Sequence, residues 1–325
     1  MRIDAEQPRY ALDVVTLGEA MLLLVADSPG ALEDAASFYK RTAGAETNVA
    51  IGLARLGLKV GWASRLGTDM MGRYLLKAMR SEGIDCSRVV CDSTQTTGFQ
   101  FKGQVLDGSD PPVEYHRQGS AASRMGLEDV DSDWLLSARH LHATGVFAAV
   151  SASTLPAARK SMDIMRSAGR SISFDPNLRP TLWATPELMR ESINELARRA
   201  DWVLPGLEEG RFLTGANSPE EIANFYRQRG AKLVVVKLGS AGAYYDSSLE
   251  GQTGSAYLPA YPVAQVIDTV GAGDGFAVGV ISALLAGLSV PQAVQRGAWI
   301  GARAVQVLGD SEGLPTRAEL AAASL

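Results

Sequence analysis

Short apolar runs alternate with stretches of helical periodicity along most of the chain. The runs are rich in Val, Leu and Ile and are bounded by glycines and polar residues, which is typical of buried strands. The candidate strands lie within residues 13–25, 59–67, 139–147, 170–177, 201–206 and 231–239. The pattern therefore predicts several strands separated by helices.

The segments between these strands place apolar residues on one helical face. Residues 46–57 show this spacing and end at Gly57, and residues 72–83 repeat it and end at Gly83. Nearer the carboxyl end, Ser289 stands at an N-cap position and Pro291 in the first turn of a further helix. Regular alternation of strand and helix predicts an α/β fold, a doubly wound and mostly parallel sheet flanked by helices on both faces.

Residues 94–118 break this rhythm, because they alternate polar and apolar positions without a helical pattern. A turn rich in Gly, Asp, Ser and Pro at 107–112 divides them, which predicts a β-hairpin. With residues at about 22–26 and 37–42, we expect this hairpin to form a small discontinuous β lid. No repeat or long linker interrupts the chain, so the sequence predicts a single domain over residues 1–325.

Composition narrows the classes of function. The 325 residues are 46% hydrophobic and 21% charged, with a formal net charge of −5, which is ordinary for a globular protein and argues against a nucleic-acid partner. No stretch approaches the 18 or so uninterrupted apolar residues of a membrane span, and residues 1–10 contain no apolar core of signal-peptide length. Cys86 and Cys91 are interpreted as reduced thiols. We expect a cytoplasmic enzyme or binding protein.

The sequence DTVGAGDGFA at residues 268–277 places three glycines around one acidic residue, directly before an apolar helical run. In an open parallel sheet, ligands bind beyond the carboxyl ends of the strands. A glycine turn at that edge exposes the first N–H groups of the following helix, which favour an anion such as a phosphate. Asp274, in the first helical turn, is then placed to accept a proton from an attacking hydroxyl.

The same residues also fit a tight strand-to-helix turn, in which Asp274 only favours the helix N-terminus. A second glycine turn opens an amphipathic helix at residues 43–57, with Asn48 in its first turn. The two turns can face each other across the strand ends, which favours the functional interpretation. The chain has no G-x-x-x-x-G-K-[ST] loop, so a P-loop nucleotide site is excluded.

Together, residues 43–57 and 268–277 closely resemble the two signature motifs of the ribokinase-like (PfkB) family of carbohydrate kinases. The resemblance extends over nearly the whole chain. It implies a doubly wound α/β domain with a small β lid, and ATP-dependent phosphorylation of a sugar-like alcohol. It also implies that Asp274 is the catalytic base and that Gly271, Ala272, Gly273 and Asp274 form the anion hole.

Four stretches, at 44–48, 113–123, 174–183 and 309–315, resemble the members of that family that phosphorylate the primary hydroxyl of the sugar acid 2-keto-3-deoxygluconate. The resemblance implies substrate contacts at Gly44, Ala45, Asn48, Tyr115, Arg117, Arg179, Asp274 and Asp310. The two arginines suit a carboxylate, which a guanidinium binds as a fork, although a single arginine is more often a surface charge. Gln100 departs from the pattern, because related kinases of this substrate class often carry an aromatic residue there.

On the nucleotide side, residues 237–245 resemble the family's loop that approaches phosphates. The implied nucleotide contacts are Asn177, Lys237, Gly239, Ser240 and Gly242. The helix around Ala298 and Trp299 is a further candidate, which helical packing explains equally well. The family's N-x-x-E motif is half present, with Gly206 in place of the asparagine and Glu209 kept. Glu209 is therefore the candidate that holds a water bound to Mg²⁺.

Other functions stay open. The substrate could be a different sugar, such as 5-dehydro-2-deoxygluconate, ribose or fructose, and the fold could serve a non-catalytic sugar or nucleotide sensor. The intact Asp274 argues against a sensor, which needs no base. Unpaired strand edges of the lid could pair between subunits, which favours a homo-oligomer. His116, His140 and His142 are interpreted as structural, because no third metal ligand lies near His140 and His142 in sequence.

Overall fold

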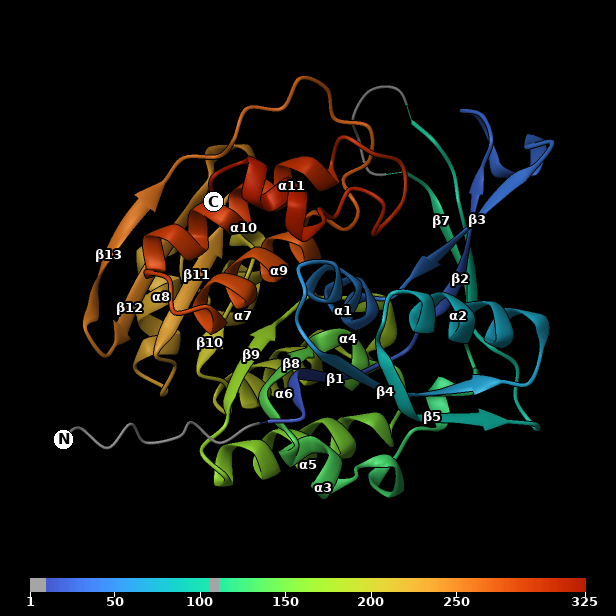
Figure 1. Cartoon of the computed structure of the whole chain (residues 1–325), viewed down its shortest axis with the longest axis horizontal. Helices are drawn as coiled ribbons and strands as arrows, with labels where there is room; N and C mark the ends of the chain where they lie inside the picture. The colour runs from blue at the N-terminus through green and yellow to red at the C-terminus, as the bar shows by residue number, and fades with distance from the viewer. Residues whose placement is uncertain (1–9, 106–110) are drawn as a thin grey trace.

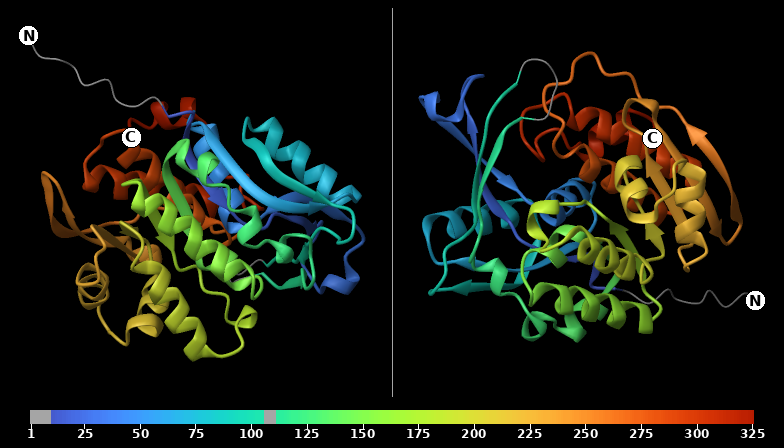
Figure 2. Two further views of the ribbon diagram at one scale, coloured as in Figure 1. Left: turned by 90° about the horizontal axis from the view of Figure 1, so that it is seen from below. Right: turned by 180° about the vertical axis from the view of Figure 1, so that it is seen from behind.

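A computed structural model describes residues 10–105 and 111–325. A nine-stranded sheet with helices on both faces forms the body, and a four-stranded sheet projects from the end of the body that carries α2 (Met70–Ser81) (Figure 1). The further views in Figure 2 show the same two parts from below and from behind. The small β sheet that the sequence analysis expected is therefore present.

The large sheet has the strand order β13-β12-β11-β10-β9-β8-β1-β4-β5. Its strands are β1 Leu12–Leu17, β4 Val60–Gly67, β5 Asp85–Asp92, β8 Ala138–Thr144, β9 Ser171–Asp175, β10 Trp202–Val203, β11 Leu233–Lys237, β12 Ala243–Leu249 and β13 Gln252–Leu258. From β11 to β5 all neighbouring strands are parallel, and β12 and β13 continue the sheet as an antiparallel hairpin. This confirms the predicted mostly parallel, doubly wound sheet.

Helices cover both faces of this sheet. One face carries α1 Ala45–Arg55, α2, α9 Ala272–Leu285, α10 Val290–Ala304 and α11 Arg317–Ala322, and the other carries α3 Ser132–Leu136, α4 Gly145–Ala149, α5 Thr154–Ser167, α6 Pro186–Ala197, α7 Leu207–Thr214 and α8 Pro219–Arg227. Val14 and Val15, neighbours on β1, pack into the two separate cores. A strand that is buried on both faces needs apolar residues at successive positions, which explains the continuous apolar runs.

The small sheet has the order β3-β2-β6-β7, built from β2 Met21–Ala26, β3 Phe38–Ala43, β6 Phe99–Lys102 and β7 Val113–His116. Strands β6 and β7 pair antiparallel, as the hairpin prediction requires. Most of the expected turn at 107–112 lies outside the described residues. His116 stacks on Phe99 with ring centroids 4.6 Å apart, which is a packing role.

His140 and His142 are buried in β8, and both hydrogen-bond the hydroxyl of Ser173 on the neighbouring strand. Burial lowers the pKa of His142 to about 3, so its ring is neutral. In the described part of the chain, no group of three or more possible ligands could hold a metal ion, and Cys86 and Cys91 are free thiols. None of the helices described combines the length and the hydropathy of a membrane span.

Candidate active site

Two glycine turns begin α1 and α9 at the carboxyl edge of the large sheet. Gly44 has φ 144° and Gly271 has φ 85°, a region that favours glycine. A Cβ atom on Gly44 would lie 2.4 Å from the carbonyl oxygen of Glu19, and one on Gly271 would lie 2.3 Å from that of Asp310. Backbone therefore passes too close to either turn to admit a side chain, and both turns line the cavity described below.

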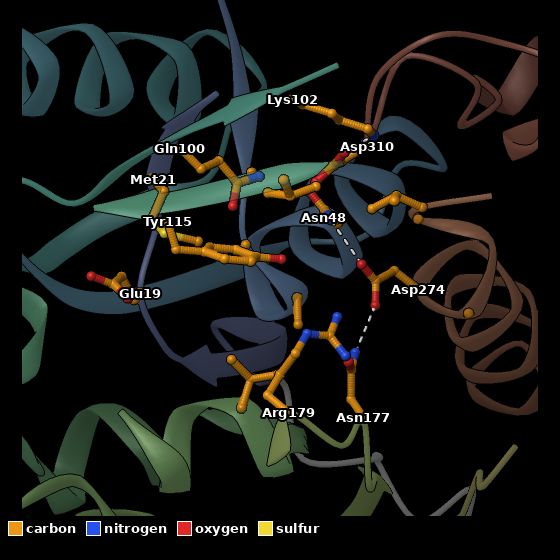
Figure 3. A pocket seen from close by; sticks show the side chains of 18 of the residues that line it. Glu19, Met21, Asn48, Gln100, Lys102, Tyr115, Asn177, Arg179, Asp274 and Asp310 are labelled. Carbon is orange, nitrogen blue, oxygen red and sulfur yellow. Dashed lines mark hydrogen bonds and ion pairs between the residues drawn. The ribbon is translucent and has the colours of Figure 1, made fainter. Parts of the chain in front are cut away.

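The first turns of α1 and α9 meet at the carboxylate of Asp274. Asn48 Nδ2 donates to Asp274 Oδ2 at 2.7 Å, and Asn177 Nδ2 donates to Asp274 Oδ1 at 3.2 Å (Figure 3). Burial, with a smaller contribution from the charge of Asp175, raises the pKa of the Asp274 carboxyl to about 7, while the hydrogen bond from Asn48 opposes this rise. A carboxyl group with this pKa can take up a proton near neutral pH.

A cavity of about 500 Å³ opens here, between the carboxyl edge of the large sheet and the inner face of the small sheet. This volume suits a small metabolite. The expected site residues that line it are Gly44, Ala45, Asn48, Tyr115, Arg117, Asn177, Arg179, Glu209, Lys237, Gly271, Gly273, Asp274 and Asp310. Ala272, Gly239, Ser240 and Gly242 do not line it. Ala272 is the first residue of α9, and the other three form the turn that follows β11.

Lys237, at the carboxyl end of β11, lies beside the start of α9. Its ammonium is 3.4 Å from the point where a Cβ on Gly273 would stand, and it pairs with Asp175 Oδ2 at 2.6 Å. Burial raises the pKa of Asp175 to about 6, against the charge of Lys237. Asn177, two residues beyond β9, has φ 39°, an uncommon backbone conformation that aims its amide at Asp274. A cationic group and an amide thus border the first turn of α9.

Glu209 lies in the first turn of α7 and accepts two backbone N–H groups. Its Oε2 accepts from Gly206 at 2.7 Å, and its Oε1 accepts from Leu178 at 2.8 Å. The carboxylate therefore fixes α7 against the loop after β9. Each of its oxygens keeps a lone pair for a further donor or for water.

The two arginines differ in their surroundings. Arg117 forms an ion pair with Glu19 through two of its nitrogens, at 2.7 and 2.5 Å, and Glu19 also accepts from the hydroxyl of Ser120. Arg179 donates to the backbone oxygen of Leu178, and no carboxylate of the described residues lies within ion-pair distance of it. Arg117 is thus in direct contact with a buried carboxylate, whereas Arg179 acts on the carboxylates of Asp274 and Asp310 only beyond ion-pair distance.

Lys102, on β6, is fully buried and joins the small sheet to the loops around α9. Its ammonium lies 2.5 Å from Asp268 Oδ2 and 2.9 Å from Asp310 Oδ1. Asp268 in turn accepts the N–H groups of Val270 and Gly309. This buried cluster holds Asp310 and the turn before α9 in place, because all three charges are desolvated and depend on one another.

Sequence reasoning missed Glu19, Lys102 and Asp175 as cavity residues. Asp175 ends β9 within the stretch FDPN, and its place at a strand end was the signal that could have found it. Glu19 lies two residues beyond the end of β1, where the same rule applies. Nothing in the sequence distinguishes Lys102 from a solvated lysine on a sheet.

Two helix N-termini that face one polar cavity, with a carboxylate beside them, define a phosphotransferase that acts on a small hydroxyl compound. Residues 11–317 match the family described as pfkB family carbohydrate kinase, and the chain belongs to this family. The kinase class and the ribokinase-like fold predicted from the sequence are confirmed.

Individual relatives resemble the chain over nearly its whole length. The 2-dehydro-3-deoxygluconokinase of Bacillus subtilis (strain 168) is 48% identical over 311 residues, which cover 95% of this chain and 94% of the relative. The crystal structure of a PfkB protein from Polaromonas sp. JS666 is 74% identical, with a TM-score of 0.88, and the match covers 96% of this chain and 100% of that one. A ribokinase II-type protein from E. coli, solved with ATP and Mg²⁺, is 27% identical with a TM-score of 0.85 over 96% of this chain and 98% of that one.

Replacing Lys102 with methionine should destabilise the protein strongly. The variant leaves Asp268 and Asp310 buried without their shared counter-charge, so we expect the free energy of unfolding in urea to fall by about 3–5 kcal/mol. Lys77→Met, which changes an exposed lysine on α2, is the control and should change the free energy of unfolding by less than about 0.5 kcal/mol. A Lys102→Met protein within about 1 kcal/mol of the wild type would contradict this account.

Proposed function

We propose that this chain transfers the terminal phosphate of ATP to the primary hydroxyl of 2-keto-3-deoxygluconate, the sugar acid also called 2-dehydro-3-deoxygluconate. The observation that carries the proposal is the Asp274 carboxylate, held by two amides at the N-terminus of α9 and facing the cavity. The identity of 48% to a 2-dehydro-3-deoxygluconokinase supports the choice of sugar.

In the proposed reaction the primary hydroxyl attacks the terminal phosphorus of ATP. A bond forms between the hydroxyl oxygen and phosphorus, the bond to ADP breaks, and the hydroxyl proton passes to Asp274. The N–H groups at Gly271, Ala272 and Gly273 face the phosphoryl oxygens, where charge develops. Preorganised donors in a buried site are the main way in which a protein accelerates phosphoryl transfer.

For ATP we propose contacts from Lys237, Asn177 and the turn at 239–242. Lys237 is beside the anion-binding turn, and the glycine turn that follows it lies at the same edge of the sheet. Glu209 suits a Mg²⁺ site through a bound water, because its carboxylate lines the cavity and keeps lone pairs free. When bound, the cation would neutralise charge on the phosphate oxygens. The similarity to the protein solved with ATP and Mg²⁺ supports both ligands.

For the sugar acid we propose that Arg179 binds the carboxylate, with Arg117 as a second donor. The guanidinium of Arg179 makes no direct ion pair with a carboxylate of the described residues and is open to one from the ligand, whereas Arg117 is already paired with Glu19. Tyr115 and Asp310 also line the cavity and suit the remaining oxygens of the sugar, as do the backbone at Gly44 and Ala45.

We propose that the small sheet acts as a lid that closes over the sugar, because its inner face supplies Gln100, Lys102 and Tyr115 to the cavity. A lid admits the substrate and then excludes water from the transfer step. Assembly of subunits through the edges of this sheet, and a cytoplasmic location, stay predictions from the sequence.

The first prediction concerns the base. Protonated Asp274 cannot accept the hydroxyl proton, so kcat/KM should fall as the pH drops below about 7. Asp274→Asn should lower turnover by roughly 10²- to 10⁴-fold and abolish this acid limb of the pH profile. The control Asp163→Asn changes an exposed carboxylate on α5 and should preserve both the wild-type turnover and the acid limb of the pH profile. An Asp274→Asn enzyme with turnover within a few-fold of the wild type would exclude Asp274 as the base.

The second prediction concerns the metal. Glu209→Gln should raise the Mg²⁺ concentration that gives half-maximal activity, because an amide attracts a hydrated cation less than a carboxylate does. Glu208→Gln changes the neighbouring exposed carboxylate and should leave the Mg²⁺ titration unchanged. The thermal midpoint should be measured for both variants, since Glu209 also caps α7. Superimposable titration curves for Glu209→Gln and the wild type would rule out a role at the metal.

The third prediction concerns the substrate and tests the function itself. In an assay of ADP release, the wild type should phosphorylate 2-keto-3-deoxygluconate more efficiently than 5-dehydro-2-deoxygluconate, ribose or fructose. Loss of a charge-assisted hydrogen bond worth about 1.5–3 kcal/mol should make kcat/KM of Arg179→Ala roughly 10- to 150-fold lower for the sugar acid. The loss should be much smaller for ribose and fructose, which have no carboxylate.

Arg80→Ala, an exposed arginine on α2, is the matched control and should leave all four substrates unaffected. If the wild type prefers ribose or fructose, the sugar acid is not its substrate, but the assignment as a sugar kinase still holds. Absence of ADP release with every sugar would favour the sensor.

A further inference from the structure

One polar side chain of the cavity has no role in the reaction as described above. Gln100 lines the cavity from β6 and is only 4% exposed. Its carboxamide oxygen is buried and has no hydrogen-bond partner in residues 10–105 and 111–325. Turning the amide about its last bond exchanges oxygen for nitrogen, so a polar group of this side chain still lacks a partner.

The register of the small sheet places Gln100 toward the cavity. Gln100 pairs with Tyr115 on β7 and with Leu23 on β2, and it shares its face of β6 with Lys102. Figure 3 shows its amide beside the ring of Tyr115, on the same side of the cavity. The side chain is therefore positioned to meet a bound sugar rather than the solvent.

In the absence of a ligand, this position disfavours glutamine. Leu23, its neighbour on β2, is completely buried, and an amide buried there without a partner costs free energy that an apolar side chain of the same length would not. Methionine would fill the same space without that cost. A hydrogen-bond partner on a bound ligand would remove this free-energy cost, which points to a contact between Gln100 and the substrate.

A second amide at the cavity also has a buried oxygen without a hydrogen-bond partner. Asn48 donates its Nδ2 to Asp274, and its Oδ1 is buried without a partner in the described residues. A sugar supplies hydroxyl donors on adjacent carbons, which match two amide acceptors. Asn48 contacts the carboxylate that we propose as the base, so it suits the hydroxyl next to the reacting alcohol. Gln100 stands nearer to Tyr115 and suits a hydroxyl farther along the sugar (Figure 3).

We propose that Gln100 is a specificity-determining residue whose amide hydrogen-bonds a secondary hydroxyl of the substrate. This inference rests on the proposed function and deepens it. The enzyme would select, among sugar acids, those that carry a hydroxyl at the matching carbon. A site built to hydrogen-bond a hydroxyl rejects analogues that lack it, because its own polar group then stays unpaired.

The test compares Gln100→Met with the wild type for both activity and stability. With the sugar acid, kcat/KM should fall about 5- to 150-fold, as expected when a buried hydroxyl loses its partner. The thermal midpoint of the free protein should stay the same or rise, because the variant removes an unsatisfied amide. A purely structural role for Gln100 would lower the midpoint instead.

Gln104→Met is the matched control, from the segment directly after β6. Gln104 does not line the cavity, and its Nε2 donates to the backbone oxygen of Ala26 at 2.6 Å. Its replacement should therefore lower the thermal midpoint and leave kcat/KM unchanged, which is the opposite of the pattern expected for Gln100→Met.

Analogues of the sugar acid that lack the hydroxyl on carbon 4 or on carbon 5 identify the contact. For one of the two, Gln100→Met and the wild type should have equal kcat/KM within about twofold, because the interaction is absent from both. The inference is overturned if Gln100→Met matches the wild type on the intact sugar acid, or if its deficit persists with both analogues. A wild type that does not use the sugar acid overturns the proposed function, and the inference with it.

Discussion

The hydrogen bond from Asn48 to Asp274 joins the first turns of α1 and α9, and the rest of the site is arranged around it. The two residues are 226 positions apart in the chain. This hydrogen bond can form only because α1 and α9 begin at the same cavity, although α1 follows a strand of the small sheet and α9 follows a loop after the last strand of the large sheet. Gly44 and Gly271 let backbone approach both turns so closely that a side chain would collide. Burial of the shared carboxylate then raises its pKa toward neutrality, which suits a group that takes up a proton.

Charge balance organises the cavity around this contact. Lys102 is paired with Asp268 and Asp310, Lys237 with Asp175, and Arg117 with Glu19, and each of these pairs contains at least one fully buried partner. A buried charge without a partner is costly, so these pairings fix the side chains in position. Arg179 differs from these three, because no carboxylate of the described residues lies at ion-pair distance from it, and its charge acts on Asp274 and Asp310 only from farther away.

The small sheet is therefore part of the site as well as its cover. Its inner face supplies Tyr115, Gln100 and Lys102, while its outer face packs aromatic rings together. The alternation of strand residues separates the two tasks, since successive side chains point to opposite faces. The ion pairs of Lys102 with Asp268 and Asp310 also connect this sheet to the loops on either side of α9.

The sequence by itself determined the alternation of strands and helices, the two glycine turns, and Asn48 and Asp274 as the polar residues in their first turns. These features are local, because each depends on periodicity or on backbone conformation within about one turn of helix. Only the tertiary structure decided which charges are paired. The sequence places Glu19 and Asp175 near strand ends but does not show their partners, Lys102 looks like a solvated lysine, and Arg117 and Arg179 look alike. Their burial and their partners come from segments remote in the chain, so hydrophobic periodicity carries no record of them. The unsatisfied amide of Gln100 belongs to the same class, because a missing partner is visible only once every neighbour is in place.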